Sequence, residues 1–482
     1  MLTIMYCILG LLGALIVFMI VRTILTKPIP VVKNEFVPKG VDADLAAEHL
    51  SGAVKFKTVT LTSPLAETDV FYKFQDYIEQ CYPNVFKVAR KTLINRYSVI
   101  YVVEGSDSNL LPVAMLAHQD VVPAPEEGWI VPPFSGEIKD GYVYGRGSQD
   151  MKSQMIAALE ALEILLKDGF KPKRTIYFCF GHDEELRGTE GARQISKYLQ
   201  EQGIRFEYVL DEGGTILDGK MLGIDNKIAL IGICEKGYAD FILEVEKPGG
   251  HASSPSKRTS VGLLAEAVYF TELAQRPTFF AKPTKDMFKA LAPYMKPIFK
   301  FLFVNRDILS PLLRLVLSKA HPMTNSLVRT TITPTMARGS DAPNVLPPRA
   351  SANINCRINT GETIEIIERH IKKVVGSKVK VRIDEGSVNP SEVSDITSPG
   401  YEVLKQTIAE VYNGYITAPF LFIAATDSKH YYPLSKSVYR FTPFEKTEDD
   451  ASRIHGINER QEIKALATGV EFYIRLYQNS CG

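Results

Sequence analysis

Histidine and carboxylate residues follow apolar runs in this sequence, at places where a fold can gather their side chains. His118 follows the apolar run 111–117, and Asp120 stands two residues later. Asp150 comes just before a long amphipathic helix pattern. Imidazole and carboxylate groups bind divalent metal ions and carry protons in hydrolysis. A single histidine after an apolar run is more often an ordinary hydrogen-bonded residue, so a metal site requires further ligands elsewhere.

Further acidic residues follow two later apolar runs. Glu184 and Glu185 come just after the run 175–180, and Asp211 directly follows the run 206–210. Any one of these carboxylates could cap a helix or lie in solvent. Several of them in one place would repel each other unless a cation were present. Taken together, they favour a metal site.

The elements that must position these residues alternate between strands and helices. Such alternation predicts an α/β fold with a mostly parallel sheet flanked by helices, whose sites lie at the carboxyl ends of the strands. The expected strands are 97–105, 111–118, 175–180 and 206–210, and the expected helices are 151–169, 190–202 and 459–478. We assign residues 41–236 to the first part of this catalytic domain and 389–482 to its second part.

Residues 237–388 have a different pattern, with the order β-α-β-β-α-β of a ferredoxin-like α+β domain. We expect this domain to be an inserted lid. An apolar and basic stretch of two or three helices, at about 276–320, interrupts it. This insertion could cap a binding site, face a membrane or simply pack into an enlarged lid.

Residues 1–26 form an N-terminal apolar segment that is long enough to span a bilayer. No basic residue precedes it, which favours a single-pass anchor over a signal sequence that is cleaved before secretion. Arg22 and Lys27 follow it, and the positive-inside tendency would then place the protein body in the cytoplasm. Residues 27–40 are expected to form a tether.

Composition excludes several classes of protein. The 482 residues carry a net charge of +1, which gives no footprint for nucleic acid. The apolar fraction of 45% is that of an ordinary globular protein, and the length predicts more than one domain. The six cysteines are widely spaced and predict no disulfide framework.

Six motifs together resemble a known family. They are His118-x-Asp120, Gly145-Arg-Gly-x-x-Asp150-Met-Lys, Asp183-Glu184-Glu185, Asp211-Glu-Gly-Gly, Gly250-His251-Ala and His455-Gly-Ile-Asn-Glu. The order of these motifs and the residues in them resemble those of the aminoacylase/carboxypeptidase family of co-catalytic zinc metallopeptidases, from about residue 45 onward. The chain is most similar to the branch that contains carboxypeptidase S and the N-fatty-acyl-amino-acid synthase/hydrolases.

The resemblance implies a centre of two zinc ions in each subunit. His118 and Asp211 would bind one zinc ion, Glu185 and His455 would bind the other, and Asp150 would bridge them. His430 remains a rival to His455 for the last ligand position, although the motif HGINE favours His455.

The resemblance also implies roles around the metals. Asp120 would orient a metal-bound imidazole, and Glu184 would act as general base. His251 and Asn344 of the lid would contact the substrate, and Arg357 could bind its carboxylate or be structural. In relatives the lid histidine often comes from a partner subunit, so a homodimer through the lid is expected.

These expectations predict a membrane-anchored zinc amidohydrolase or metallocarboxypeptidase. It would cleave N-acyl amino acids or short peptides and release a free amino acid. Two alternatives are a catalytically silent binding or receptor-like protein on the same scaffold, and a non-hydrolytic membrane protein.

Overall fold

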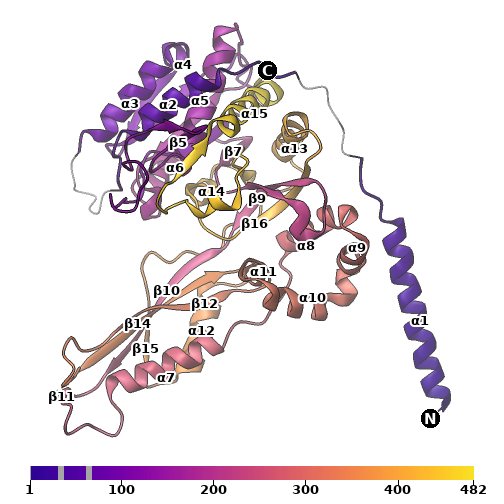
Figure 1. Cartoon of the computed structure of the whole chain (residues 1–482), viewed down its shortest axis with the longest axis vertical. Helices are drawn as coiled ribbons and strands as arrows, with labels where there is room; N and C mark the ends of the chain where they lie inside the picture. The colour runs from indigo at the N-terminus through magenta and orange to yellow at the C-terminus, as the bar shows by residue number, and fades with distance from the viewer. Residues whose placement is uncertain (1, 31–36, 61–67) are drawn as a thin grey trace. The chain divides into compact units, whose positions relative to one another are not determined.

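The computed structural model describes residues 2–30, 37–60 and 68–482 (Figure 1). It divides the chain into two compact units. Unit 1 comprises Met1–Lys27, Cys234–Val393 and Leu421–Ala425, and unit 2 comprises Pro28–Ile233, Ser394–Phe420 and Thr426–Gly482. Residues 31–36 of the expected tether lie outside the described residues.

The main sheet has a parallel centre. Its strands are β1 (Arg90–Ile94), β2 (Ser98–Val103), β3 (Val113–His118), β6 (Ile176–Gly181), β7 (Tyr208–Asp211), β8 (Thr215–Asp218), β9 (Lys227–Glu235), β16 (Ile416–Phe422) and β17 (Val438–Arg440). They lie in the order β1-β2-β6-β3-β7-β17-β9-β16, and β8 pairs with β9. Strand β3 is parallel to β6 and β7, and β7 is parallel to β17. Antiparallel pairs flank this centre. The predicted α/β sheet is confirmed.

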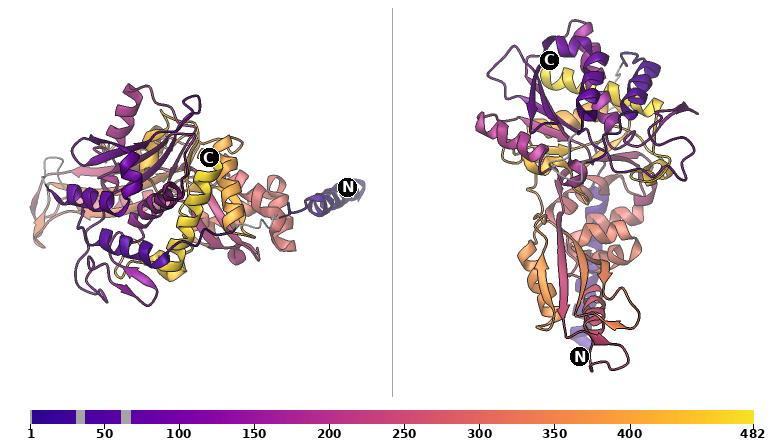
Figure 2. Two further views of the ribbon diagram at one scale, coloured as in Figure 1. Left: turned by 90° about the horizontal axis from the view of Figure 1, so that it is seen from above. Right: turned by 90° about the vertical axis from the view of Figure 1, so that its left-hand side faces the viewer.

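Helices cover both faces of this sheet, so β3 and β6 are buried at every position. On one face, Ile195 of α6 (Ala192–Glu201) packs into the same apolar cluster as Leu116 of β3. On the other face lie α5 (Lys152–Lys167) and α15 (Ile463–Cys481). Tyr477 of α15 contacts the ring of Phe178 on β6, and its hydroxyl donates to the Ala158 carbonyl of α5. Figure 2 gives two further views of these layers.

The remaining elements of unit 2 lie around these layers. They are α2 (Ala43–Val54), α3 (Val70–Cys81), α4 (Pro83–Val88), α13 (Pro399–Val411), α14 (Glu448–Ser452), β4 (Ile138–Lys139), β5 (Tyr142–Tyr144) and β18 (Arg460–Glu462). We expected the last helix to begin at Glu459. It begins at Ile463 instead, because β18 precedes it and pairs with β5.

Unit 1 contains a second sheet, in the order β12-β14-β10-β15. Its elements are β10 (Gly237–Glu246), α7 (Ser260–Leu273), β12 (Thr331–Arg338), β14 (Arg349–Ile358), α12 (Ile364–Val375) and β15 (Lys380–Ile383). The chain order is the predicted β-α-β-β-α-β. Residues of α7 and α12 share one apolar cluster with the strands, so both helices cover the same face (Figure 1).

The insertion is helical, as the sequence predicts. It contains α8 (Lys282–Leu291), α9 (Pro297–Val304) and α10 (Arg306–Ala320), and α11 (Pro322–Val328) follows. The N-terminal helix α1 (Leu2–Leu25) also belongs to unit 1. By length and composition, residues Thr3–Leu25 could cross a membrane, or they could be a signal sequence.

Candidate metal centre

The ends of three neighbouring strands of the main sheet bring the predicted residues together. His118 is the last residue of β3, and its register partner on β6 is Gly181. Glu184 and Glu185 lie in the turn that follows β6, and Glu212 directly follows β7. Because β6, β3 and β7 run parallel, their carboxyl ends share one edge of the sheet.

Asp150 lies between two histidines. Its Oδ1 is 3.0 Å from Nε2 of His118, and its Oδ2 is 3.0 Å from Nε2 of His455. Glu185 Oε1 lies 3.3 Å from the same nitrogen of His455. Each oxygen of Asp150 thus faces a different imidazole.

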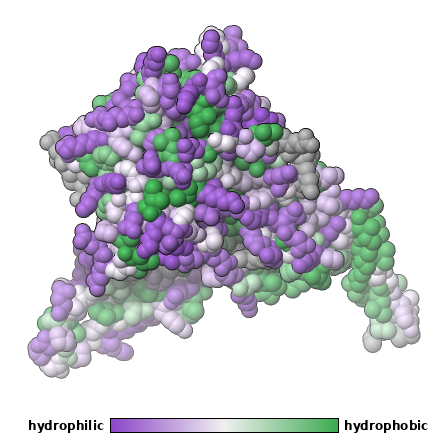
Figure 3. Space-filling model, turned by 45° about the horizontal axis from the view of Figure 1, so that its top comes forward, coloured by the Kyte–Doolittle hydropathy of each residue, from purple (hydrophilic) through white to green (hydrophobic). Residues whose placement is uncertain are grey.

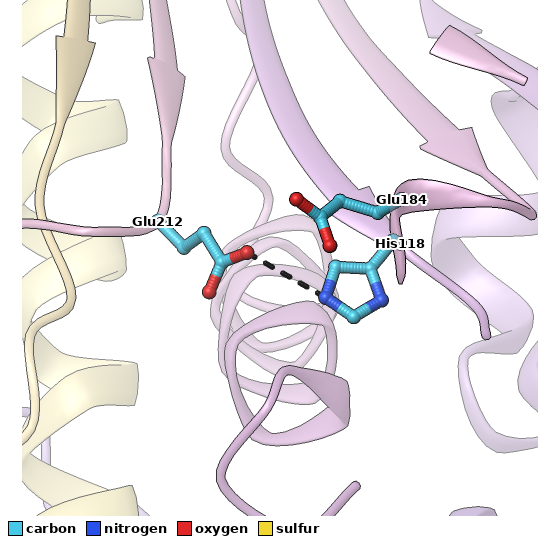
Figure 4. A group of neighbouring side chains, drawn as sticks. All are labelled: His118, Glu184 and Glu212. Carbon is cyan, nitrogen blue, oxygen red and sulfur yellow. Dashed lines mark ion pairs between the residues drawn. The ribbon is translucent and has the colours of Figure 1, made fainter. Parts of the chain in front are cut away.

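Two groups of side chains converge closely enough to hold metal ions. In each group, one ligand atom per residue lies within 4.8 Å of the others. One group is His118, Asp150 and Glu185, and the other is His118, Glu184 and Glu212. Figure 4 shows the second group, in which Glu212 Oε1 lies 3.5 Å from Nε2 of His118.

The donor chemistry of this centre fits a divalent metal cation. Imidazole nitrogens and carboxylate oxygens are the ligands that zinc takes in catalytic sites. Oε1 of Glu185 is buried, and it faces Nε2 of His455 at 3.3 Å. A cation would satisfy this oxygen and offset the repulsion among the carboxylates.

Asp211 is not a member of either group, although the sequence pointed to it. Its Oδ2 accepts the backbone N–H of Ser428 at 2.8 Å, and its Oδ1 accepts that of Glu212 at 2.9 Å. Asp211 is the last residue of β7, and its carboxylate binds backbone there. The next residue, Glu212, reaches His118 instead.

Asp120 supports the centre in two ways. Its Oδ1 lies 3.4 Å from Nδ1 of His118, whose nearest acceptor is the backbone oxygen of Asp120 at 2.9 Å. Its carboxylate also accepts the backbone N–H groups of Glu184 and Glu185, at 3.1 and 3.2 Å. Burial opposes ionisation, but hydrogen bonds from His118 and Thr60 outweigh it and lower the pKa of Asp120. Asp120 thereby fixes both the imidazole and the turn that carries the two glutamates.

The carboxyl group of Glu184 lies in the most acidic surroundings. Burial raises its pKa well above the usual value, and the neighbouring carboxylates of Glu212, Asp427 and Glu185 add to this effect, against the opposing influence of His118. A carboxyl group with a raised pKa can accept a proton and release it again near neutral pH. This property fits the proton carrier of a hydrolytic reaction.

A buried ion pair holds the backbone on both sides of Asp150 and His455. Nη1 of Arg146 lies 2.5 Å from Oε2 of Glu459. Oε1 of Glu459 accepts the backbone N–H of Asp150 at 3.2 Å, while Nη2 of Arg146 donates to the carbonyl of His455 at 3.0 Å. Sequence reasoning missed both members, although each lies within a quoted motif, GRG or HGINE.

Neither His455 nor its rival His430 is a member of these two groups. Nε2 of His430 lies 3.0 Å from the backbone oxygen of Arg187. His455, in contrast, faces Asp150 and Glu185 directly.

The three expected substrate contacts belong to unit 1. Strand β11 (Gly250–His251) pairs with β13 (Val345–Leu346), and the N–H of Ala252 donates to the Asn344 carbonyl. His251 and Asn344, both exposed, are therefore neighbours. Arg357 lies elsewhere, on β14, with its guanidinium 4.7 Å from the ring centre of Tyr238. Burial lowers the pKa of Arg357.

Residues 114–479 match the family described as Peptidase family M20/M25/M40. The chain belongs to this family. It is 41% identical over 441 residues to the N-fatty-acyl-amino acid synthase/hydrolase PM20D1 of Xenopus tropicalis, covering 90% of this chain and 85% of that protein. It is 37% identical over 445 residues to the probable carboxypeptidase S-like 2 of Dictyostelium discoideum, with 90% and 85% covered.

Solved M20 structures share the fold. The M20 family metallo-carboxypeptidase Sso-CP2 from Sulfolobus solfataricus superposes with a TM-score of 0.66 at 16% identity, covering 90% of this chain and 99% of that one. Human carnosine dipeptidase 1 gives a TM-score of 0.65 at 15% identity, with 91% and 96% covered. The chain is thus a member of a metallopeptidase family, with a metal-binding arrangement at the edge of its main sheet.

We expect metal binding to release protons near pH 7. Hydrogen bonds to Asp150 and Glu185 raise the pKa of His455 to about 10 in the metal-free chain, so its imidazole is protonated at pH 7. A metal ion must displace that proton, so metal affinity should fall as the pH is lowered. Calorimetric titration with zinc in buffers of different ionisation enthalpy measures the protons released.

The matched control is His455→Ala, which lacks this proton and should release fewer protons than the wild type. Heats that do not depend on the buffer in the wild type would contradict the expected protonation of His455.

Proposed function

We propose that the chain is a two-zinc amidohydrolase that releases a free amino acid from N-acyl amino acids or from short peptides with a free C-terminus. The observation that supports this most is the position of Asp150, whose two oxygens each face a different histidine. Two metal ions that share such a carboxylate can act together on one amide bond.

We assign the ligands residue by residue. His118 and Glu212 would hold one zinc ion, and Glu185 and His455 would hold the other, with Asp150 between them. Glu212 faces His118, whereas Asp211, the ligand that the resemblance implies, accepts two backbone N–H groups and remains the alternative at this position.

In this proposal, the protein's own side chains transfer the proton and position the metal ligand. Zinc, when bound, lowers the pKa of water and polarises the amide carbonyl. Glu184 accepts the proton of the attacking water and donates it to the leaving nitrogen. Asp120 keeps the imidazole of His118 in position and holds the turn that carries Glu184.

The relatives support this substrate class. An N-acyl amino acid and the C-terminal residue of a peptide have the same core, an amide whose nitrogen bears an amino acid with a free carboxylate. His251 and Asn344 are proposed to contact the substrate from unit 1. Arg357 is the weaker choice, since its guanidinium already stacks on Tyr238. A catalytically silent receptor is the alternative, and the presence of both Glu184 and the ligand residues argues against it.

A homodimer through unit 1 is part of the proposal. Its support is an apolar hollow of about 440 Å³ between α7 and the end of β12, lined in part by Val261, Val268 and Ala337. Exposed Tyr269 and Leu273 extend the apolar surface of α7. Sedimentation of the chain in detergent tests this; a monomer at all concentrations would contradict it.

We expect Asp150→Ala to lose both metal ions. The wild-type chain, purified without chelator, should hold about two zinc ions. Removing the shared ligand weakens both sites, whereas Glu212→Gln should weaken only one. Metal analysis by mass spectrometry gives the count, and Asp218→Asn, which changes an exposed acidic residue at the end of β8, should keep the full content. Full metal content in Asp150→Ala would refute the bridging role.

We expect Glu184→Gln to separate catalysis from metal binding. The amide keeps the size of the side chain but cannot carry the proton, so turnover should fall by at least about a hundredfold while the metal content is unchanged. Glu185→Gln is the matched control: it should lose metal from one site. Hydrolysis of an N-acyl amino acid provides the readout. Near-normal turnover in Glu184→Gln would show that the mechanism is wrong.

We also propose that α1 is an uncleaved membrane anchor. The full-length protein should then remain with membranes after an alkaline wash, because a spanning helix is held by the hydrocarbon core. A chain that lacks residues 1–26 should be released. Recovery of a shortened protein in the medium would instead support a cleaved signal sequence and secretion.

A further inference from the structure

The N-terminal helix is docked on the helical insertion of unit 1. Nδ2 of Asn305 donates to Oγ1 of Thr23 at 3.0 Å and to the carbonyl of Met19 at 3.2 Å. Arg22 forms an ion pair with Asp307 at 3.1 Å. Asn305 is fully buried, so its side-chain N–H group depends on these acceptors of α1 rather than on water. The last turns of α1 are therefore fixed to the start of α10.

The rest of α1 extends beyond this contact. Figure 3 shows strongly hydrophobic residues over much of this helix, with a paler lower end. The stretch from Thr3 to Met19 is about 24 Å long at 1.5 Å per residue, which approaches the thickness of the hydrocarbon core. If α1 spans a bilayer, the docked end lies where the helix leaves it. The neighbouring helices α9 and α10 must then lie close to the lipid headgroups.

Helix α10 is apolar on two sides. Leu313 and Leu317 are buried, as their spacing of four residues predicts for an inward face. Leu312, Leu315 and Val316 lie on another face and are each about half exposed, at 52%, 53% and 51%. The fold of unit 1 does not use this second face.

Helix α9 repeats this arrangement. Phe303 is buried and stacks on Phe288 of α8, with ring centres 4.3 Å apart. Ile298 and Phe299 are exposed. We call the five exposed residues of the two helices the α9–α10 apolar surface: Ile298, Phe299, Leu312, Leu315 and Val316.

Positive charge accompanies this surface. Residues 276–320 contain nine Lys and Arg residues and two acidic residues, a net charge of +7, although the whole chain carries only +1. Lys296 and Lys300 flank the exposed residues of α9, and Arg314 and Lys319 lie on α10. Apolar faces with adjacent basic residues are typical of helices that lie in the headgroup region of an anionic bilayer.

We infer that the α9–α10 apolar surface inserts into the headgroup region of the same bilayer that α1 spans, with anionic lipid as its partner. This inference rests on the proposed anchor. A second copy of the chain is a poorer partner, because two surfaces with this excess of positive charge would repel each other. Long acyl chains of the proposed substrates partition into the bilayer, so unit 1 would lie where those substrates are most concentrated.

Lipid-dependent quenching of tryptophan tests this inference on the full-length protein. Leu315→Trp is reconstituted into vesicles that contain anionic phosphatidylserine and lipids brominated near the headgroup end of the acyl chain. The native chain has one tryptophan, Trp129, which gives the baseline. The added fluorescence of Leu315→Trp should be lost in brominated vesicles, and more is lost with phosphatidylserine than with phosphatidylcholine alone.

Two further variants make the result decisive. Leu93→Trp replaces a leucine of similar exposure, 48%, in unit 2 and should show no extra quenching. Leu12→Trp, measured in vesicles of lipids brominated near the methyl end of the acyl chain, reports on α1 itself. Quenching at position 12 without quenching at 315 would overturn this inference and leave the anchor intact, and equal quenching at 93 and 315 would also overturn it. No quenching at either 12 or 315 would overturn the anchor as well. Hydrolysis of a water-soluble short-chain substrate by each variant reports on the proposed enzyme independently.

Discussion

Like charges held close together are the constraint on which the catalytic unit depends. Four carboxylates meet two imidazoles at one edge of the main sheet: Asp150, Glu184, Glu185 and Glu212, with His118 and His455. Two unit charges 4 Å apart interact with about 4 kcal/mol at an effective dielectric constant of 20. Hydrogen bonds hold the segments that carry these carboxylates: Asp120 accepts the N–H groups of Glu184 and Glu185, and Glu459 accepts that of Asp150. The same repulsion, together with burial, raises the pKa of Glu184.

The sequence predicts most of the candidate site because a parallel sheet carries its functional residues at the carboxyl ends of its strands. Apolar runs that end in polar residues locate the carboxyl ends of β3, β6 and β7, and these ends must meet. The order of helix and strand patterns in residues 237–388 likewise predicts α7 and α12. Local patterns of this kind depend only on neighbouring residues, so they can be read without knowing the fold.

The features that the sequence could not supply depend on contacts between distant segments. Asp211 and Glu212 are adjacent acidic residues, and only the fold shows that Glu212 faces His118 while Asp211 accepts the Ser428 N–H. Arg146 and Glu459 are far apart in the chain, so nothing in either motif indicates their pairing. The last helix starts late for the same reason, because the pairing of β18 with β5 is a long-range contact.

The position of β17 has a consequence for synthesis of the chain. This strand lies between β7 and β9, yet it consists of residues 438–440, which leave the ribosome after all of β10 to β15. A nascent chain can therefore complete the sheet of unit 1 while the main sheet still has a gap at its centre. His455 and Glu459 emerge later still, so the candidate metal centre can assemble only when little more than β18 and α15 remains to be made. A chain that stalls before β17 leaves the facing edges of β7 and β9 unpaired.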